Sequence, residues 1–170
     1  MRATVFLCRR KQPVGTAYKG FNDSLAAWTQ HRYMSQQCGA AYLNTFQQVN
    51  TTFSTITQLG AIEIDTWNDY EEGTEIETGI DNCLSVNAAI SGSTLTFALS
   101  GAGDEGFTVD HYTVYASTDG QNLTRVADLV PGTRSFDLAG QGVAQGTYIY
   151  LKMQSKLGFL TQMAGPLTYN

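Results

Sequence analysis

The sequence predicts two units in series, an α+β portion over residues 1–83 and an all-β sandwich over residues 84–170. Before residue 83, strand-like β-branched runs flank a segment with helical apolar spacing. After it, apolar and polar residues alternate with period two between glycine-rich turns. The change of period near residues 82–85 therefore marks the expected boundary.

The first portion contains about two β/α units. We expect a strand near Val14–Tyr18, a helix near Gly39–Phe53 and a second strand near Ala61–Trp67. An apolar series predicts the core-facing side of the helical segment; its members are Met34, Leu43, Phe46, Val49 and Phe53.

An acidic segment follows the second strand, with five carboxylates within the nine residues 69–77. In β/α barrels the catalytic groups lie on loops after the strands, and hydrolysis of a glycosidic bond typically uses two carboxyl groups. We expect Asp69 and Glu72 to form such a pair, with Trp67 or Tyr70 stacking on a sugar ring. A solvated acidic loop fits the same spacing equally well.

The run Trp67-Asn68-Asp69-Tyr70-Glu71-Glu72-Gly73-Thr74 resembles the acidic motif of glycoside hydrolase families 71 (α-1,3-glucanases) and 99 (endo-α-mannanases). Asp69 and Glu72 match the two acids of that motif, and Tyr70 matches the aromatic residue between them. The segment Gly15–Asp23 resembles the preceding strand and loop in relatives of those enzymes.

This resemblance implies a partial β/α barrel that hydrolyses α-linked polysaccharide such as α-1,3-glucan, with Glu72 as general acid and Asp69 as its partner. It also implies a secreted parent protein. The expected substrate-binding residues are Trp67, Asn68, Tyr70, Lys19 and Asp23. For Lys19 and Asp23, which could line a sugar pocket as donor and acceptor, a surface loop is the alternative. Such barrels need about 250 residues, whereas this chain has 170. The expected object is thus a C-terminal fragment of a longer enzyme or a small descendant of one.

Catalysis therefore stays open at this point. One alternative is a noncatalytic carbohydrate-binding or spacer module, in which the sandwich carries the function. Another is a piece that self-associates through exposed barrel edges, because unpaired strand edges and apolar faces invite pairing.

The short strands of the second unit, separated by turns, predict a seven-strand sandwich of immunoglobulin type. Alternation is clearest in Leu95–Leu99, Tyr112–Ala116 and Thr147–Met153. The stretch Val109–Gly120 resembles the central hairpin of fibronectin type III domains. Tyr148 is the candidate for the corner tyrosine that bonds nearby backbone in such sandwiches. The alternative is an exposed sugar-stacking strip, made of Tyr115, Tyr148 and Tyr150.

Composition and charge exclude several classes. The net charge of −5 argues against a nucleic-acid partner, and Arg9-Arg10-Lys11 is interpreted as a solvated terminus. Apolar runs fall short of the roughly 18 to 20 residues that span a bilayer, and the first residues do not predict a signal peptide.

The cysteines and histidines complete the sequence predictions. We expect a Cys38–Cys83 disulfide, which leaves Cys8 free. His31 and His111 lie far apart in the sequence without ligand-spaced neighbours, so we predict no metal site and no cofactor. The expected partner is an oligosaccharide or polysaccharide.

Overall fold

The computed structural model describes residues 13–156 and 158–170. The predictions that concern Cys8 and Arg9-Arg10-Lys11 lie outside these residues. Most of the regular structure is β-sheet, and the larger sheets form a sandwich-like arrangement.

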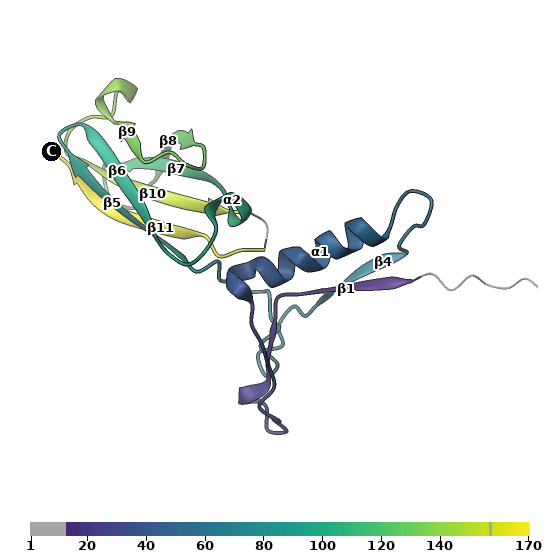
Figure 1. Ribbon diagram of the computed structural model, residues 1–170. Helices are drawn as coiled ribbons and strands as arrows, with labels where there is room; N and C mark the ends of the chain where they lie inside the picture. The colour runs from purple at the N-terminus through teal and green to yellow at the C-terminus, as the bar shows by residue number, and fades with distance from the viewer. Residues whose placement is uncertain (1–12, 157) are drawn as a thin grey trace, which may run out of the picture.

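One β-α-β unit forms the N-terminal part (Figure 1). Strands β1 (Val14–Tyr18) and β4 (Ala61–Asp65) pair in parallel, and helix α1 (Ala40–Thr52) lies between them in the sequence. Parallel neighbours require a crossover of this kind. The described residues do not form a β/α barrel, because only these two strands make the parallel sheet. The partial-barrel prediction thus reduces to a β-α-β unit.

A small core joins α1 to β1. Ala17 and Tyr42 are buried in it, and Phe46 packs against them. The helical spacing thus correctly predicts Leu43 and Phe46 as core-facing residues. Met34 departs from that prediction, since it lies in strand β3 (Tyr33–Met34) and is 46% exposed.

Long loops follow β1 and β4. The loop after β1 contains β2 (Phe21–Asn22), the 3-10 turn η1 (Asp23–Leu25) and β3. β2 and β3 pair antiparallel, and a second 3-10 turn, η2 (Gln37–Gly39), leads into α1. In Figure 1 these loops project from the lower end of the molecule, away from the sandwich. The carboxyl ends of both parallel strands thus open into loops.

The C-terminal part is a sandwich of two antiparallel sheets, as the all-β prediction requires. One sheet has the order β11-β10-β7-β8 and the other β5-β6-β9. The bounds are β5 (Leu84–Ser91), β6 (Thr94–Gly101), β7 (Val109–Ser117), β8 (Thr124–Leu129), β9 (Ser135–Asp137), β10 (Thr147–Ser155) and β11 (Gln162–Tyr169). Short helical turns α2 (Glu105–Thr108) and η3 (Ala139–Gln141) interrupt them.

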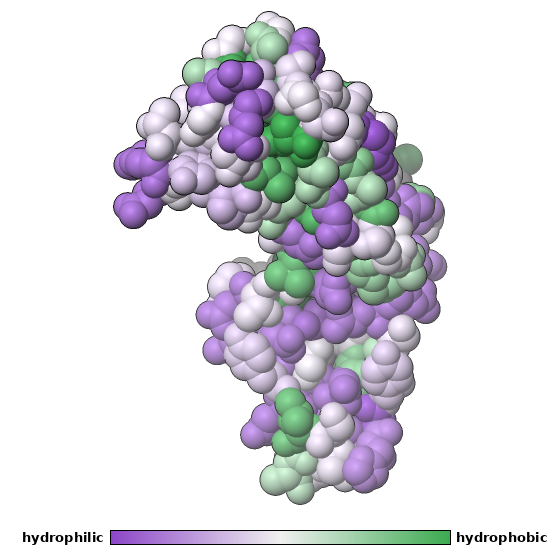
Figure 2. All heavy atoms as spheres, turned by 90° about the vertical axis from the view of Figure 1, so that its left-hand side faces the viewer, coloured by the Kyte–Doolittle hydropathy of each residue, from purple (hydrophilic) through white to green (hydrophobic). Residues whose placement is uncertain are grey.

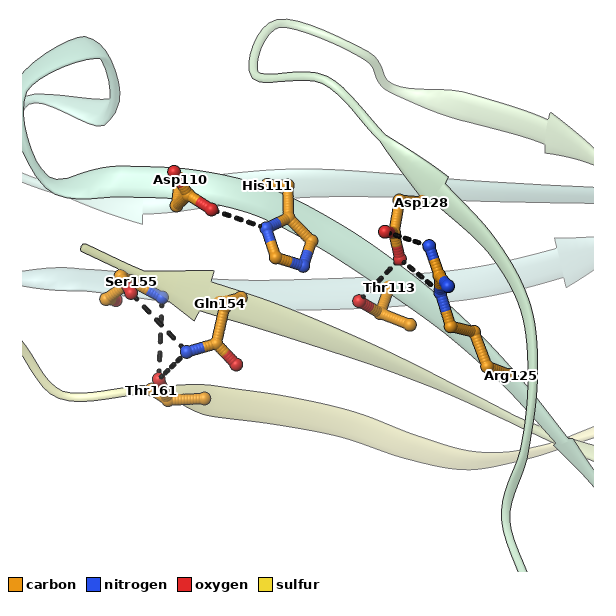
Figure 3. A network of polar contacts seen from close by, with 8 residues as sticks. All are labelled: Asp110, His111, Thr113, Arg125, Asp128, Gln154, Ser155 and Thr161. Carbon is orange, nitrogen blue, oxygen red and sulfur yellow. Dashed lines mark hydrogen bonds and ion pairs between the residues drawn. The ribbon is translucent and has the colours of Figure 1, made fainter. Parts of the chain in front are cut away.

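The two-residue alternation explains how each strand contributes to the core. On β10, Ile149, Leu151 and Met153 are fully buried in the main core cluster. Burial of such a side chain contributes about 1.5 to 3 kcal/mol. Figure 3 shows hydrogen-bonded polar side chains on the four-stranded sheet, including Thr113 with Asp128 and Gln154 with Thr161. The two-residue alternation in the sequence therefore predicts which side chains of β10 face the core.

The predicted corner tyrosine needs a correction. The hydroxyl of Tyr150 donates to the carbonyl of Gly120 at 2.9 Å, whereas the Tyr148 side chain makes no hydrogen bond to a described residue and is 37% exposed. Tyr150 lies opposite Tyr115 on the neighbouring strand. The backbone-anchoring role therefore belongs to Tyr150, two residues beyond the predicted position.

A disulfide and a turn connect the two parts. Cys38 and Cys83 form the disulfide expected from the sequence, and this bond ties η2 to the residue before β5. Phe159, between β10 and β11, packs edge-on to Tyr42 of α1 with ring centroids 6.4 Å apart. Phe159 also forms a bridge with Ile80. The N-terminal core is thus completed by a residue from the sandwich.

Candidate functional site

The loops after β1 and β4 meet and enclose a cleft. The Asn22 N–H donates to the carbonyl of Glu72 at 2.7 Å, and Gly73, with φ +62°, lies against Asn22 so closely that a side chain would crowd it. The cleft has a volume of about 710 Å³. Its walls come from both loops and include Tyr33 and Tyr70. Segments about 50 residues apart therefore build one surface.

The acidic turn after β4 is organised by Asp69. Its Oδ1 accepts the N–H of Glu72 at 3.0 Å, while its carbonyl accepts the N–H of Thr74 at 3.1 Å. This is the local capping behaviour typical of aspartate in turns. The half-buried Glu72 side chain makes no hydrogen bond to any described residue. Of the two predicted catalytic acids, Glu72 is thus the one with both carboxylate oxygens free of such bonds.

Exposed aromatic side chains accompany the acids. Trp67 is 61% exposed and Tyr70 48%, and the neighbouring Asn68 is exposed as well. The Tyr70 hydroxyl donates to Glu77 Oε2 at 2.8 Å, and this hydrogen bond raises the pKa of Tyr70. Both predicted stacking residues are therefore accessible, but only Tyr70 lines the cleft.

Lys19 lies at the carboxyl end of β1 and pairs with Glu75. Their Nζ and Oε1 atoms are 2.7 Å apart, and the Lys19 side chain is 4% exposed. Because a buried ammonium is costly unless paired, this ion pair holds the two loops together. Glu75 lines the cleft but is missing from the predicted site residues, although it belongs to the acidic run that drew attention to this loop.

Asp23 is buried beneath the loop after β1. Its oxygens accept hydrogen bonds from the Thr29 hydroxyl, from the backbone of Gln30 and Arg32, and from Arg32 Nε at 2.8 Å. Burial raises the pKa of Asp23. The hydrogen bonds, of which that from Arg32 is the strongest, have the larger and opposite effect and lower the pKa to about 2. The Arg32 guanidinium in turn lies over the Phe21 and Trp28 rings. Asp23 therefore fixes the shape of the loop from below.

The surface around the cleft is mixed in character. Figure 2 shows this lower end of the molecule as largely hydrophilic, with a small apolar patch near its tip. Exposed apolar and aromatic residues of the first loop are Leu25, Trp28, Tyr33 and Met34. A surface with accessible rings, hydroxyls and carboxylates can hold a ligand that has both apolar faces and hydroxyl groups.

The described residues contain no cluster of three metal-ligating side chains. None of the helices in this part of the chain has the length and apolar character needed to traverse a bilayer.

Comparisons with protein-family models, with curated proteins and with solved structures each return no match for this chain. The geometry of the cleft and the residues that line it are accordingly the basis of the functional assignment.

Proposed function

We propose that this chain binds an α-linked polysaccharide in the cleft between the two loops and supplies the acidic residues of a glycoside hydrolase. The observation that carries the proposal is the position of the acidic turn and its exposed rings. They follow β4 directly and are tied to the loop of the parallel neighbour β1. Carboxyl ends of parallel strands are where catalytic groups of β/α enzymes gather.

The proposed roles follow from the contacts. Glu72 acts as the general acid, because its carboxylate makes no hydrogen bond to a described residue and because it adjoins Gly73, which lines the cleft, although Glu72 itself is not among the lining residues. Asp69 is its partner and also holds the turn through its bond to the Glu72 N–H. Trp67 and Tyr70 stack on sugar rings, with Asn68 beside them. Lys19 and Asp23 position the loops, through Glu75 and Arg32 respectively.

The test is reducing-sugar release from a panel of α-1,3-, α-1,6-, β-1,3- and β-1,4-linked glycans. Wild-type protein should release sugar from an α-linked glycan, and Glu72→Gln should lower the rate by about 10² to 10⁴, the usual contribution of a general acid. Glu71→Gln is the matched control, since Glu71 is an exposed neighbour in the same turn. Equal rates for wild type and Glu72→Gln would exclude Glu72 as the acid.

A second candidate is a noncatalytic carbohydrate-binding or spacer module that ends in a fibronectin type III-like sandwich. The bonding of Asp69 within its own turn favours it, because that bond already occupies one of its two oxygens. Co-sedimentation with insoluble α-1,3-glucan separates the two. A binding module should lose binding in Trp67→Ala and keep it in Glu72→Gln, with no sugar release from wild type.

Two subsidiary expectations belong to this proposal. A secreted location suits the Cys38–Cys83 disulfide, since disulfides persist in oxidising compartments. Self-association through β4 is favoured by its exposed Ile62 and Ile64, which are 40% and 45% exposed. Sedimentation at several protein concentrations should then reveal a species heavier than the 18.5 kDa chain, and a constant mass would contradict it.

A further inference from the structure

A second hollow lies between α1 and the segment that leads into α2. Figure 1 places α2 beside the N-terminal end of α1. The hollow has a volume of about 360 Å³. Leu43, Asn44 and Gln47 line it from the helix, and Asp104 and Phe107 line it from the sandwich. It is therefore formed jointly by residues from both parts of the chain.

The hollow lies next to the cleft described above, here called the acidic cleft, and two residues line both. Gln37 and Cys38 line both cavities, and they have φ angles of +51° and +53°. Such angles are uncommon for residues other than glycine and occur often at functional sites. The disulfide from Cys38 to Cys83 fixes this strained pair against the sandwich. A chain-like ligand leaving the cleft past Gln37 would therefore meet the hollow.

The lining chemistry indicates a neutral, hydroxyl-rich ligand. The side-chain amides of Gln37, Asn44 and Gln47 make no hydrogen bond to any described residue, so each offers a donor and an acceptor. Phe107 is 66% exposed and presents a ring that can pack on an apolar sugar face. No described Lys or Arg lines the hollow, whereas the acidic residue Asp104 does, with its Oδ1 accepting the N–H of Phe107 at 3.2 Å; this lining disfavours an anion.

We propose that this hollow is a second saccharide subsite, which binds units of a neutral glycan beyond those held in the acidic cleft. The choice of an α-linked glycan as the probe rests on the proposed function above. The subsite itself rests on the unpaired amides, the exposed ring and the shared Gln37–Cys38 wall. Phe107 from the sandwich and Gln47 from α1 line the subsite from opposite sides.

Calorimetric titration of the full chain with α-1,3-linked gluco-oligosaccharides of increasing length tests the proposal. Phe107→Ala and Gln47→Ala should each weaken binding of the long oligosaccharides about three- to tenfold, as expected for loss of one ring contact or one hydrogen bond. Binding of the disaccharide in the cleft should stay unchanged. Gln121→Ala is the matched control, because Gln121 is an exposed glutamine outside the hollow. Unchanged thermal unfolding would confirm that the variants fold.

The outcomes separate this subsite from the acidic cleft. Tyr70→Ala should weaken binding at every length if the cleft binds saccharide, because Tyr70 lines it. If Tyr70→Ala has an effect while Phe107→Ala and Gln47→Ala bind every length like wild type, the subsite is refuted and the proposed function stands. If only the two hollow variants lose affinity, the subsite stands and the cleft assignment fails. A wild-type chain that binds none of these saccharides overturns both.

Discussion

At the residue scale, several carboxylates of this chain hold backbone in place. Asp119 accepts the N–H groups of Gln121 and Asn122 in one turn, and hydrogen bonds from that turn hold its pKa well below the usual range. Asp23 and Asp69 do the same in their loops. An acid that caps a turn and an acid that performs catalysis can occupy the same sequence pattern. Only the hydrogen-bond partners distinguish them.

Glu105 provides a prediction about stability and pH. The Arg134 guanidinium lowers the pKa of Glu105 against the opposing effect of burial, and with bonds from Tyr112 and the Gly132 N–H the pKa falls to about 2. Because the pKa of the folded state lies below the ordinary value of 4.5, this contribution to the free energy of unfolding is present above pH 4.5. It is lost as the pH falls toward 2.

Glu105→Gln should therefore lower the melting temperature at pH 7 by roughly 3 to 6 °C and by much less near pH 2.5. Thermal unfolding followed by circular dichroism at both pH values measures this. The control is Glu71→Gln, an exposed acid, which should melt like wild type at each pH. A deficit for Glu105→Gln that is the same at both pH values would rule out the assigned role of its carboxylate.

The candidate site was predictable from the sequence only in part. The crowding of acids after Ile64 predicts an acidic loop after the second strand, and the structure shows that this loop meets the one after β1. The roles of Glu75 and Lys19 could not be read, because their contact spans 56 residues and depends on how two irregular loops meet. The unpaired amides of α1 carried no signal, since solvent-facing glutamine and asparagine are ordinary on a helix.

At the element scale, periodicity predicted the regular structure well. β1 has the predicted bounds, α1 differs by one residue at each end, and β10 extends the predicted strand by two residues. These patterns are local, so a sequence window contains the whole signal. The second strand ends at Asp65, two residues early, because the acidic turn begins there and its hydrogen bonds compete with the sheet.

Gly39 provides the element-scale prediction. It is the N-cap residue of α1 and has φ +87°, and a Cβ there would lie 2.1 Å from Cε1 of the buried Phe159. Gly39→Ala should therefore cost the backbone strain of about 1 to 2 kcal/mol and a further cost of about 1 to 3 kcal/mol for overpacking. Gly92→Ala is the matched control, since Gly92 has φ +58° with nothing near its Cβ position.

Urea unfolding of both variants measures the difference. Gly92→Ala should lose only the strain, so the gap between the two variants reports the contact between α1 and Phe159. Equal losses in both variants would mean that α1 does not pack against Phe159 as described.

At the scale of the whole molecule, the connection between the two parts is the feature that the sequence could least predict. Among the described residues, the N-terminal core cluster contains four buried hydrophobic residues, namely Ala17, Tyr42, Ile80 and Phe159. Phe159 comes from the turn between β10 and β11, more than 100 residues along the chain from Tyr42. Periodicity carries no information on such a contact. The disulfide, in contrast, could be predicted from the cysteine positions, because only the three cysteines of the sequence can form one.

The last prediction concerns this connection. The disulfide closes a segment with a sequence separation of 45 residues, and loss of a cross-link over that length costs about 2 to 4 kcal/mol. Both tryptophans, Trp28 and Trp67, lie in the N-terminal part, so their fluorescence reports on that part, whereas far-ultraviolet circular dichroism is dominated by the larger sandwich. In wild type the small N-terminal core depends on Phe159, so both signals should change at the same urea concentration.

In the double variant Cys38→Ser/Cys83→Ser, the fluorescence transition should move to lower urea while the circular dichroism transition stays close to its wild-type position. The reason is that the sandwich has its own core, with twelve buried hydrophobic residues in the described part of the chain, whereas the β-α-β unit loses its covalent tether. A reducing agent should shift wild type in the same way and leave the double variant unaffected. If both transitions move together by the same amount, the two parts fold as one cooperative unit, and the tether stabilises the whole chain.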